Sequence, residues 1–234
     1  MINDIYTKEI IVMTEKRKLT IYKIFIYCVI FYALWSVREL IIRPVFLDSL
    51  NDRMFQISET LMKLTVWTLP AVFLIWHYQD DMWISLKEMF TNKLKWFKEA
   101  PIFMVILIPL LMAWFSFGKI EIHPDFRPLS LIGTVIFVGI TEEAVFRGWL
   151  LNAMLKKMRL WSAILLNAVL FLIAHFPYWI YLRYDLFEFL SGCVSALILS
   201  ILFSWAFVKS KNIFIPITLH MTWNFLLLMF FFGN

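Results

Sequence analysis

Long apolar stretches alternate with short polar segments along the whole chain. Seven apolar runs are visible, at 21–42, 60–78, 101–118, 129–151, 160–178, 187–208 and 212–232. A helix needs about 20 mainly apolar residues to cross a bilayer, and lipid offers the backbone no hydrogen-bond partner outside the helix itself. The pattern therefore predicts an all-α fold, a polytopic transmembrane helix bundle of about seven spans.

The composition agrees with a membrane protein and argues against a nucleic-acid-binding one. Of the 234 residues, 62% are hydrophobic and 17% are charged, whereas soluble domains are about half apolar and about a quarter charged. The net charge of +5 comes from Lys and Arg that lie in short clusters between the apolar runs. We therefore expect the lipid bilayer, and no nucleic acid, as a partner.

The distribution of Lys and Arg predicts the orientation in the membrane. Segments 1–23, 79–100, 156–159 and 209–211 carry fourteen of them, and the alternate side, with Lys63 counted there, carries seven. The basic side of a membrane protein faces the cytoplasm, so the N-terminus is predicted inside and the C-terminus outside. Many Lys, Ile and Phe with only six Gly suggest an AT-rich genome, and hence a multi-pass protein of a bacterial cell membrane.

Two adjacent acids lie inside the fourth apolar run, where ionisable side chains are expensive to bury. Glu143 and Arg147 are four residues apart and share a helix face, so they are placed to pair. Glu142 points about 100° away from Glu143 on a helix and is available for another task. The alternative interpretation is an interfacial salt bridge, with Arg147 reaching toward the membrane surface.

Two further spans carry histidines. In the fifth apolar run, His175 follows Phe171 by four residues. In the last run, His220 precedes Asn224 by four residues. Either histidine alone is typical of a packing residue. Together with the acid doublet, they provide what hydrolysis inside a bilayer requires, namely a general base, a group that positions water and donors for an oxyanion.

The same residues are also compatible with a metal site. Glu142, His175 and His220 are ligand types that hold Zn²⁺ or another divalent metal, with water in the fourth position. The chain contains no His-Glu-x-x-His element, so a conventional zinc peptidase helix is not predicted.

Three ordered motifs, Glu142-Glu143-x-x-x-Arg147, Phe171-x-x-x-His175 and His220-x-x-x-Asn224, resemble those of the CAAX-processing and bacteriocin-processing membrane endopeptidases, the CPBP or Abi family. The resemblance covers about the last hundred residues. It divides a single membrane domain into N-terminal helices without a motif (1–128) and a catalytic core (129–234).

The resemblance implies a polar active-site cavity within the bundle and a role for each motif residue. Glu142 would be the base for the attacking water, with His175 helping to activate it, while His220 and Asn224 would form the oxyanion hole. Glu143, Arg147 and Phe171 would support the site. Family members have been described both as metalloproteases and as metal-independent glutamate peptidases, so the resemblance leaves metal dependence open.

The leading hypothesis is an intramembrane endopeptidase that cuts a membrane-associated peptide or protein. A second hypothesis is a non-catalytic protein of the same fold, acting as a bacteriocin immunity factor or as a modulator of a sensor kinase. A third is an ion-coupled transporter, because intramembrane acids and histidines also serve as relays. The sequence shows no internal repeat and no pair of Gly/Pro-broken helices, which disfavours the transporter.

Overall fold

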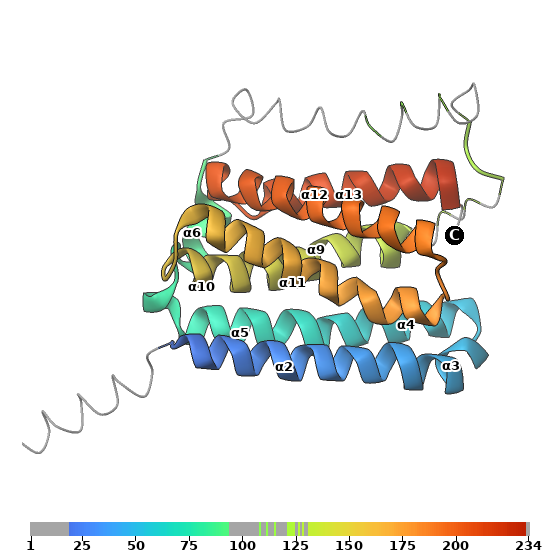
Figure 1. The fold of residues 1–234 in the computed structure, drawn as a ribbon, viewed down its shortest axis with the longest axis horizontal. Coiled ribbons are helices and arrows are strands. Elements are labelled where there is room, and N and C mark those ends of the chain that lie inside the picture. Colours follow the sequence, from blue (N-terminus) through green and yellow to red (C-terminus); the bar gives the residue numbers. More distant parts are fainter. Residues whose placement is uncertain are drawn as a thin grey trace, which may run out of the picture.

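The computed structural model describes residues 19–93 and 131–232, and between them only residues 108, 111, 115, 121–124, 126 and 128. Within these residues the chain forms helices joined by short turns and contains no strand. The helices lie side by side along the long axis of the molecule (Figure 1). The predicted all-α fold class is confirmed.

Several helices are long and apolar enough to cross a membrane. Among the described residues there are five: Ile21–Ser49, Asp52–His77, Leu160–Tyr181, Leu186–Ser210 and Phe214–Phe231. From residue 131 on, the predicted run 129–151 is an unbroken helical stretch, and of the run 101–118 the structure describes only residues 108, 111 and 115. The polytopic membrane architecture is therefore confirmed, while the count of seven spans stays a prediction.

The first two spans form a helical hairpin on one side of the bundle (Figure 1). The first consists of α2 (Ile21–Val37), η1 (Arg38–Ile42), α3 (Arg43–Val45) and η2 (Leu47–Ser49). The side chain of Asn51 accepts a hydrogen bond from the Met54 amide and so starts the second. That span consists of α4 (Asp52–Met62), η3 (Lys63–Thr68) and α5 (Leu69–His77).

The central helix contains the acid doublet and is the most deeply buried part of the chain. It is built from η6 (Leu131–Phe137), α9 (Val138–Glu143), η7 (Ala144–Leu151) and α10 (Asn152–Leu155). Every residue from Val145 to Met154 is buried, because α5 and α11 pack against η7 and α13 packs against α9. A helix that is enclosed on all sides can carry polar groups only if they are paired within the bundle.

Three long helices complete the bundle: α11 (Leu160–Tyr181), α12 (Leu186–Ser210) and α13 (Phe214–Leu227), the last continued by η8 (Leu228–Phe232). Asp185 and Glu188 form a capping box that starts α12. Lys211 adopts a left-handed conformation at its end, with φ of 51°, which allows α13 to fold back against α12. Helices α12 and α13 lie on the side of the central helix opposite α2 (Figure 1).

The described parts of the four segments that were predicted to be cytoplasmic, 19–23, 79–93, 156–159 and 209–211, meet at one end of the bundle. The loop after α5 carries η4 (Gln79–Asp81) and α6 (Leu86–Thr91). Asp81 accepts a hydrogen bond from the Leu19 amide at 2.7 Å and lies 3.7 Å from the Lys157 ammonium. Asn92 donates to the Lys211 carbonyl at 2.8 Å. One end therefore holds the described parts of all four basic segments, and its assignment to the cytoplasm stays a prediction.

Candidate active site

The two acids of the doublet lie at the end of α9 in different surroundings. Glu143 is fully buried, and its Oε1 accepts a hydrogen bond of 2.8 Å from Arg147. This is the ion pair that their four-residue spacing predicts. Arg147 also donates to the carbonyl and the hydroxyl of Ser200 on α12, at 3.1 and 2.8 Å. Its guanidinium also lies over the rings of Phe171 and Phe203, so a carboxylate, Ser200 and two aromatic rings stabilise its charge, although its Nε atom makes no hydrogen bond.

His220 joins α13 to the acid doublet. Its Nδ1 lies 2.8 Å from Glu143 Oε1, and its Nε2 lies 3.9 Å from Glu142 Oε2. The close approach of the two helices depends on Gly139, where a Cβ atom would come within 2.5 Å of the Met221 Cγ and 3.4 Å of the Met221 amide nitrogen. A larger residue at this position would push α13, and with it His220, away from the acids.

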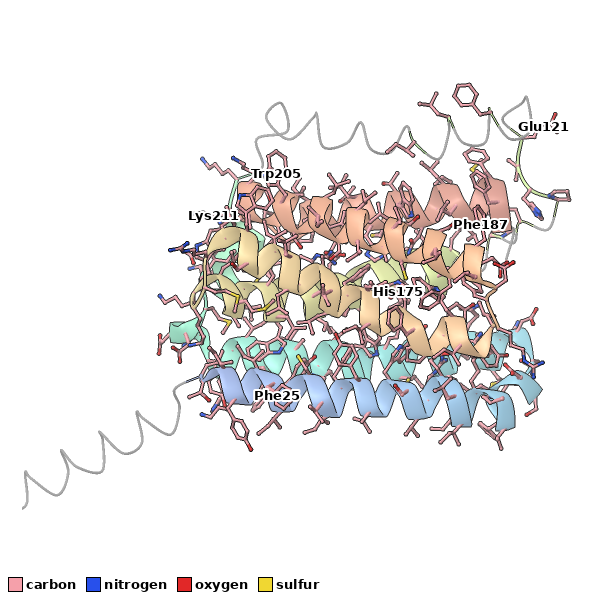
Figure 2. The ribbon with its side chains drawn as sticks, viewed as in Figure 1. Phe25, Glu121, His175, Phe187, Trp205 and Lys211 are labelled. Atoms are coloured by element: carbon pink, nitrogen blue, oxygen red, sulfur yellow. The ribbon has the colours of Figure 1, made fainter. Side chains whose placement is uncertain are left out.

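His175 lies on α11 and faces the same region from another side. Its Nδ1 lies 2.9 Å from the Phe171 carbonyl oxygen. A carbonyl only accepts hydrogen bonds, so Nδ1 carries the proton and the neutral ring keeps a free lone pair on Nε2. Figure 2 shows His175 within the bundle, whereas Phe25 and Phe187 lie on its outside.

A cavity of about 570 Å³ lies inside the bundle, and both Glu142 and His175 line it. It extends from these two residues to Arg43 and Asp52, which lie near the end of the bundle opposite the four basic segments (Figure 1). The helices that contribute its walls are α2 with η1, α4 with η3, η6 with α9, and α11. A volume of this size accommodates a few residues of an extended peptide.

Lys63 is the site residue that the sequence pattern missed. The charge count placed it on the outer side of the membrane, but in the structure its side chain is buried in the cavity wall, with its Nζ 3.3 Å from Glu142 Oε1. A single lysine near the predicted start of a span is typical of the membrane interface. The hydropathy and charge pattern therefore does not distinguish Lys63 from ordinary surface lysines. Each acid of the doublet thus has its own cation, Lys63 for Glu142 and Arg147 for Glu143.

Asn224 is less directly placed than the other motif residues. It lies one helical turn after His220 on α13, and its amide donates to the Thr134 carbonyl at 3.3 Å. Thr134 lines the cavity. The amide group is therefore directed toward η6, behind the cavity wall, and its predicted place in an oxyanion hole stays a prediction.

A second charged cluster lines the cavity away from the doublet and was also missed by the sequence pattern. Arg38 pairs with Glu39 and with Glu59 on α4, and Arg43 donates to Glu39 at 3.2 Å. The Arg43 guanidinium also lies over the rings of Phe55, Tyr178 and Tyr181. The cluster makes the route from the bundle end to Glu142 polar, because Glu39, Arg43 and Glu59 all line it.

The donor set as arranged does not fit a divalent metal. Among the residues that the structure describes, no group of three or more His, Cys, Asp and Glu side chains is placed to hold a metal ion. The ammonium of Lys63 lies 3.3 Å from Glu142 Oε1 and would repel a second cation there. We therefore derive no step through a metal, and the metal dependence that the sequence leaves open is not tested by the structure.

The arrangement combines a carboxylate and an imidazole that share a cavity with a supporting network behind them. The Glu142 Oε2 and the His175 Nε2 can both accept a proton from water. Glu143, Arg147 and Ser200 hold His220 in place through a chain of hydrogen bonds. Such a set can activate water for attack on an electrophile that enters the cavity.

Comparison with known proteins gives one result for this region. Residues 124–226 match a family model described as type II CAAX prenyl endopeptidase, Rce1-like, which confirms the resemblance drawn from the three motifs. The match begins just before the central helix and includes all three motifs. No curated protein and no solved structure matches the chain.

Proposed function

We propose that the protein hydrolyses a peptide bond in a membrane-associated peptide or protein, a proposal supported by the match of residues 124–226 to the Rce1-like model of type II CAAX prenyl endopeptidases. The observation that carries the proposal is that Glu142 and His175 line one cavity inside a membrane-spanning bundle. Proteolysis at this position requires both a base for water and a space for peptide, and the cavity offers both.

In the proposed reaction, Glu142 accepts a proton from a water molecule that His175 Nε2 also orients. The water oxygen forms a bond with the carbonyl carbon, and the carbonyl becomes a tetrahedral oxyanion. The proton held by Glu142 then passes to the amide nitrogen as the C–N bond breaks, which releases a carboxylic acid and an amine. Water is thereby divided between the two products, and the enzyme returns to its starting state.

The oxyanion is proposed to be held by His220 and Asn224. His220 uses its Nδ1 for Glu143, so it can donate to an oxyanion only from a protonated Nε2. The carboxylates of Glu143 and Glu142 lie 2.8 and 3.9 Å from its Nδ1 and Nε2 atoms. Asn224 would have to turn its amide from the Thr134 carbonyl toward the cavity.

The first test uses purified protein in proteoliposomes and a farnesylated peptide that ends in a CAAX sequence, with products identified by mass spectrometry. Wild type is expected to release the C-terminal tripeptide, and Glu142→Gln is expected to lower kcat about 100- to 10,000-fold, the contribution of a general base. The same pair is also compared in cells, by profiling new peptide termini in the membrane fraction. Cleavage that is unchanged in Glu142→Gln protein of normal stability would refute the proposal.

A further inference from the structure

Lys63 lies outside the matched family segment and yet contacts the residue proposed as the base. It begins η3, and only 6% of its surface is exposed. Its Nζ is 3.3 Å from Glu142 Oε1, and both side chains line the cavity. A buried lysine in contact with this carboxylate either orients it for the reaction or only neutralises its charge. The surrounding geometry favours the first role.

The ammonium lies against two neighbouring aromatic rings, whose centres are 4.8 Å apart. It lies 5.2 Å from the centre of the Trp67 ring and 5.7 Å from that of Trp35, within the range of cation–π attraction. Trp35 is fixed in turn, because its indole donates to the Ala174 carbonyl at 2.8 Å, next to His175 in the chain. A lysine is normally a mobile point charge, but here the direction of its charge is set by the fold.

We infer that Lys63 is a positioning residue for Glu142, an inference that rests on the proposed function. The ammonium engages Oε1, so the carboxylate is fixed with Oε2 as the oxygen that faces His220 and accepts the proton from water. It also places one positive charge beside the carboxylate throughout the reaction. The first half of the chain therefore supplies a part of the catalytic apparatus that the family segment lacks.

Charge balance in the bundle supports this inference. Glu142, Glu143, Lys63 and Arg147 form two ion pairs, 3.3 and 2.8 Å long, inside the bundle. An unpaired charge inside a membrane protein costs several kcal/mol, so each acid needs its cation. Since Arg147 is committed to Glu143 and Ser200, Lys63 is the cation left for Glu142.

The experiment compares Lys63→Met, Lys63→Arg and Lys63→Cys. The Cys variant is measured before and after alkylation with 2-bromoethylamine, which rebuilds an ammonium at nearly the same distance from the backbone as in lysine. Cys28→Ala and Cys193→Ala are included so that only the new thiol reacts. The matched control is Lys209→Met, because Lys209 also lies over a tryptophan, Trp205 at 5.3 Å, but at the end of α12. Activity is measured on the farnesylated peptide in proteoliposomes.

We expect Lys63→Met to lower kcat about 10- to 100-fold with little change in KM, the scale of one lost charge-assisted contact. Aminoethylation of Lys63→Cys is expected to restore most of the lost kcat. Lys63→Arg is expected to restore only part, because a planar guanidinium packs differently against the two rings and the carboxylate. Lys209→Met should behave as wild type. A purely structural lysine would not show recovery of kcat that depends on the added ammonium.

A kcat of Lys63→Met equal to that of wild type, or aminoethylation without recovery, would overturn the inference. If Glu142→Gln also keeps activity, the proposed function fails; if only the Lys63 variants keep it, the failure is confined to Lys63. Should Lys63→Met not fold, Lys63→Gln takes its place in a double-mutant cycle with Glu142→Gln on thermal unfolding. Additive losses in that cycle would show that the two side chains do not interact and would refute the inference.

Discussion

His220 on α13 and Glu143 on α9 are joined by a hydrogen bond of 2.8 Å between Nδ1 and Oε1. The same Oε1 atom accepts the hydrogen bond from Arg147. The second acid of the doublet thus orients a histidine from another helix, while the first acid lines the cavity. This difference separates the expected effects of substituting the two acids.

Glu143→Gln is expected to be the more destabilising substitution of the doublet. It leaves the fully buried Arg147 charge unpaired, which costs about 3–5 kcal/mol when one partner of a buried pair is removed. Glu142→Gln should cost less, because the Glu142 side chain lines a polar cavity. Thermal unfolding of both variants in the same detergent measures the difference, and equal losses of stability would contradict it.

His175→Ala is expected to lower kcat about 100- to 10,000-fold, because it removes the imidazole that orients the attacking water. His77→Ala is a matched control, since His77 also contacts aromatic rings, those of Phe73 and Tyr78, but ends α5 and does not line the cavity. Initial rates on the farnesylated peptide compare the two. An active His175→Ala enzyme would assign water activation to Glu142 alone.

Asn224→Ala is expected to lower kcat about 100- to 1,000-fold with KM nearly unchanged, the signature of a lost oxyanion donor. Thr222→Ala, on the same helix, removes a hydroxyl that donates only to the Thr218 carbonyl and should be neutral. If Asn224→Ala lowers thermal stability and leaves kcat intact, then the contact with Thr134 is structural and the oxyanion role is wrong.

Hydrolysis is expected to survive treatment with EDTA and 1,10-phenanthroline. The reason is that the Lys63 ammonium already lies on the Glu142 oxygen that a divalent cation would need. Metal content of the purified protein by mass spectrometry, before and after chelation, accompanies the rates. Activity that is lost on chelation and recovered with Zn²⁺ would support the metal site that the sequence leaves open.

The end of the bundle that carries the basic segments is expected to face the cytoplasm. A membrane-impermeant maleimide should label Ser49→Cys in intact cells, because Ser49 is exposed between the first two spans. Lys209→Cys, exposed at the end of α12, should be labelled only after permeabilisation. Both variants carry Cys28→Ala and Cys193→Ala, and the reverse labelling pattern would invert the topology.

The sequence predicted the helices best where the bundle is uniformly apolar. The runs 160–178 and 187–208 correspond to α11 (Leu160–Tyr181) and α12 (Leu186–Ser210). The second span begins at Asp52 and not near residue 60, because Gln56 and Glu59 on α4 line the cavity. Polar residues that line an internal cavity lower the local hydropathy, so the sequence pattern predicts a loop where the helix in fact continues.

The motif residues were predictable because each carries an unusual group in an apolar run, whereas their partners were not. Ser200 is an ordinary serine in a long apolar helix, and only the folded structure brings it 2.8 Å from Arg147. Lys63 is separated from Glu142 by 79 positions. No periodicity in a single sequence encodes a contact between helices so far apart in the chain.

The cavity wall formed by Trp35 and Lys63 has a consequence for how this chain can be divided. A fragment made of residues 124–226 would keep every residue of the family signature. It would nevertheless leave Glu142 open to lipid on the side where α2 and η3 now lie, with no ammonium beside it. The residues of the family signature are thus separable from the helices that enclose Glu142 in this chain.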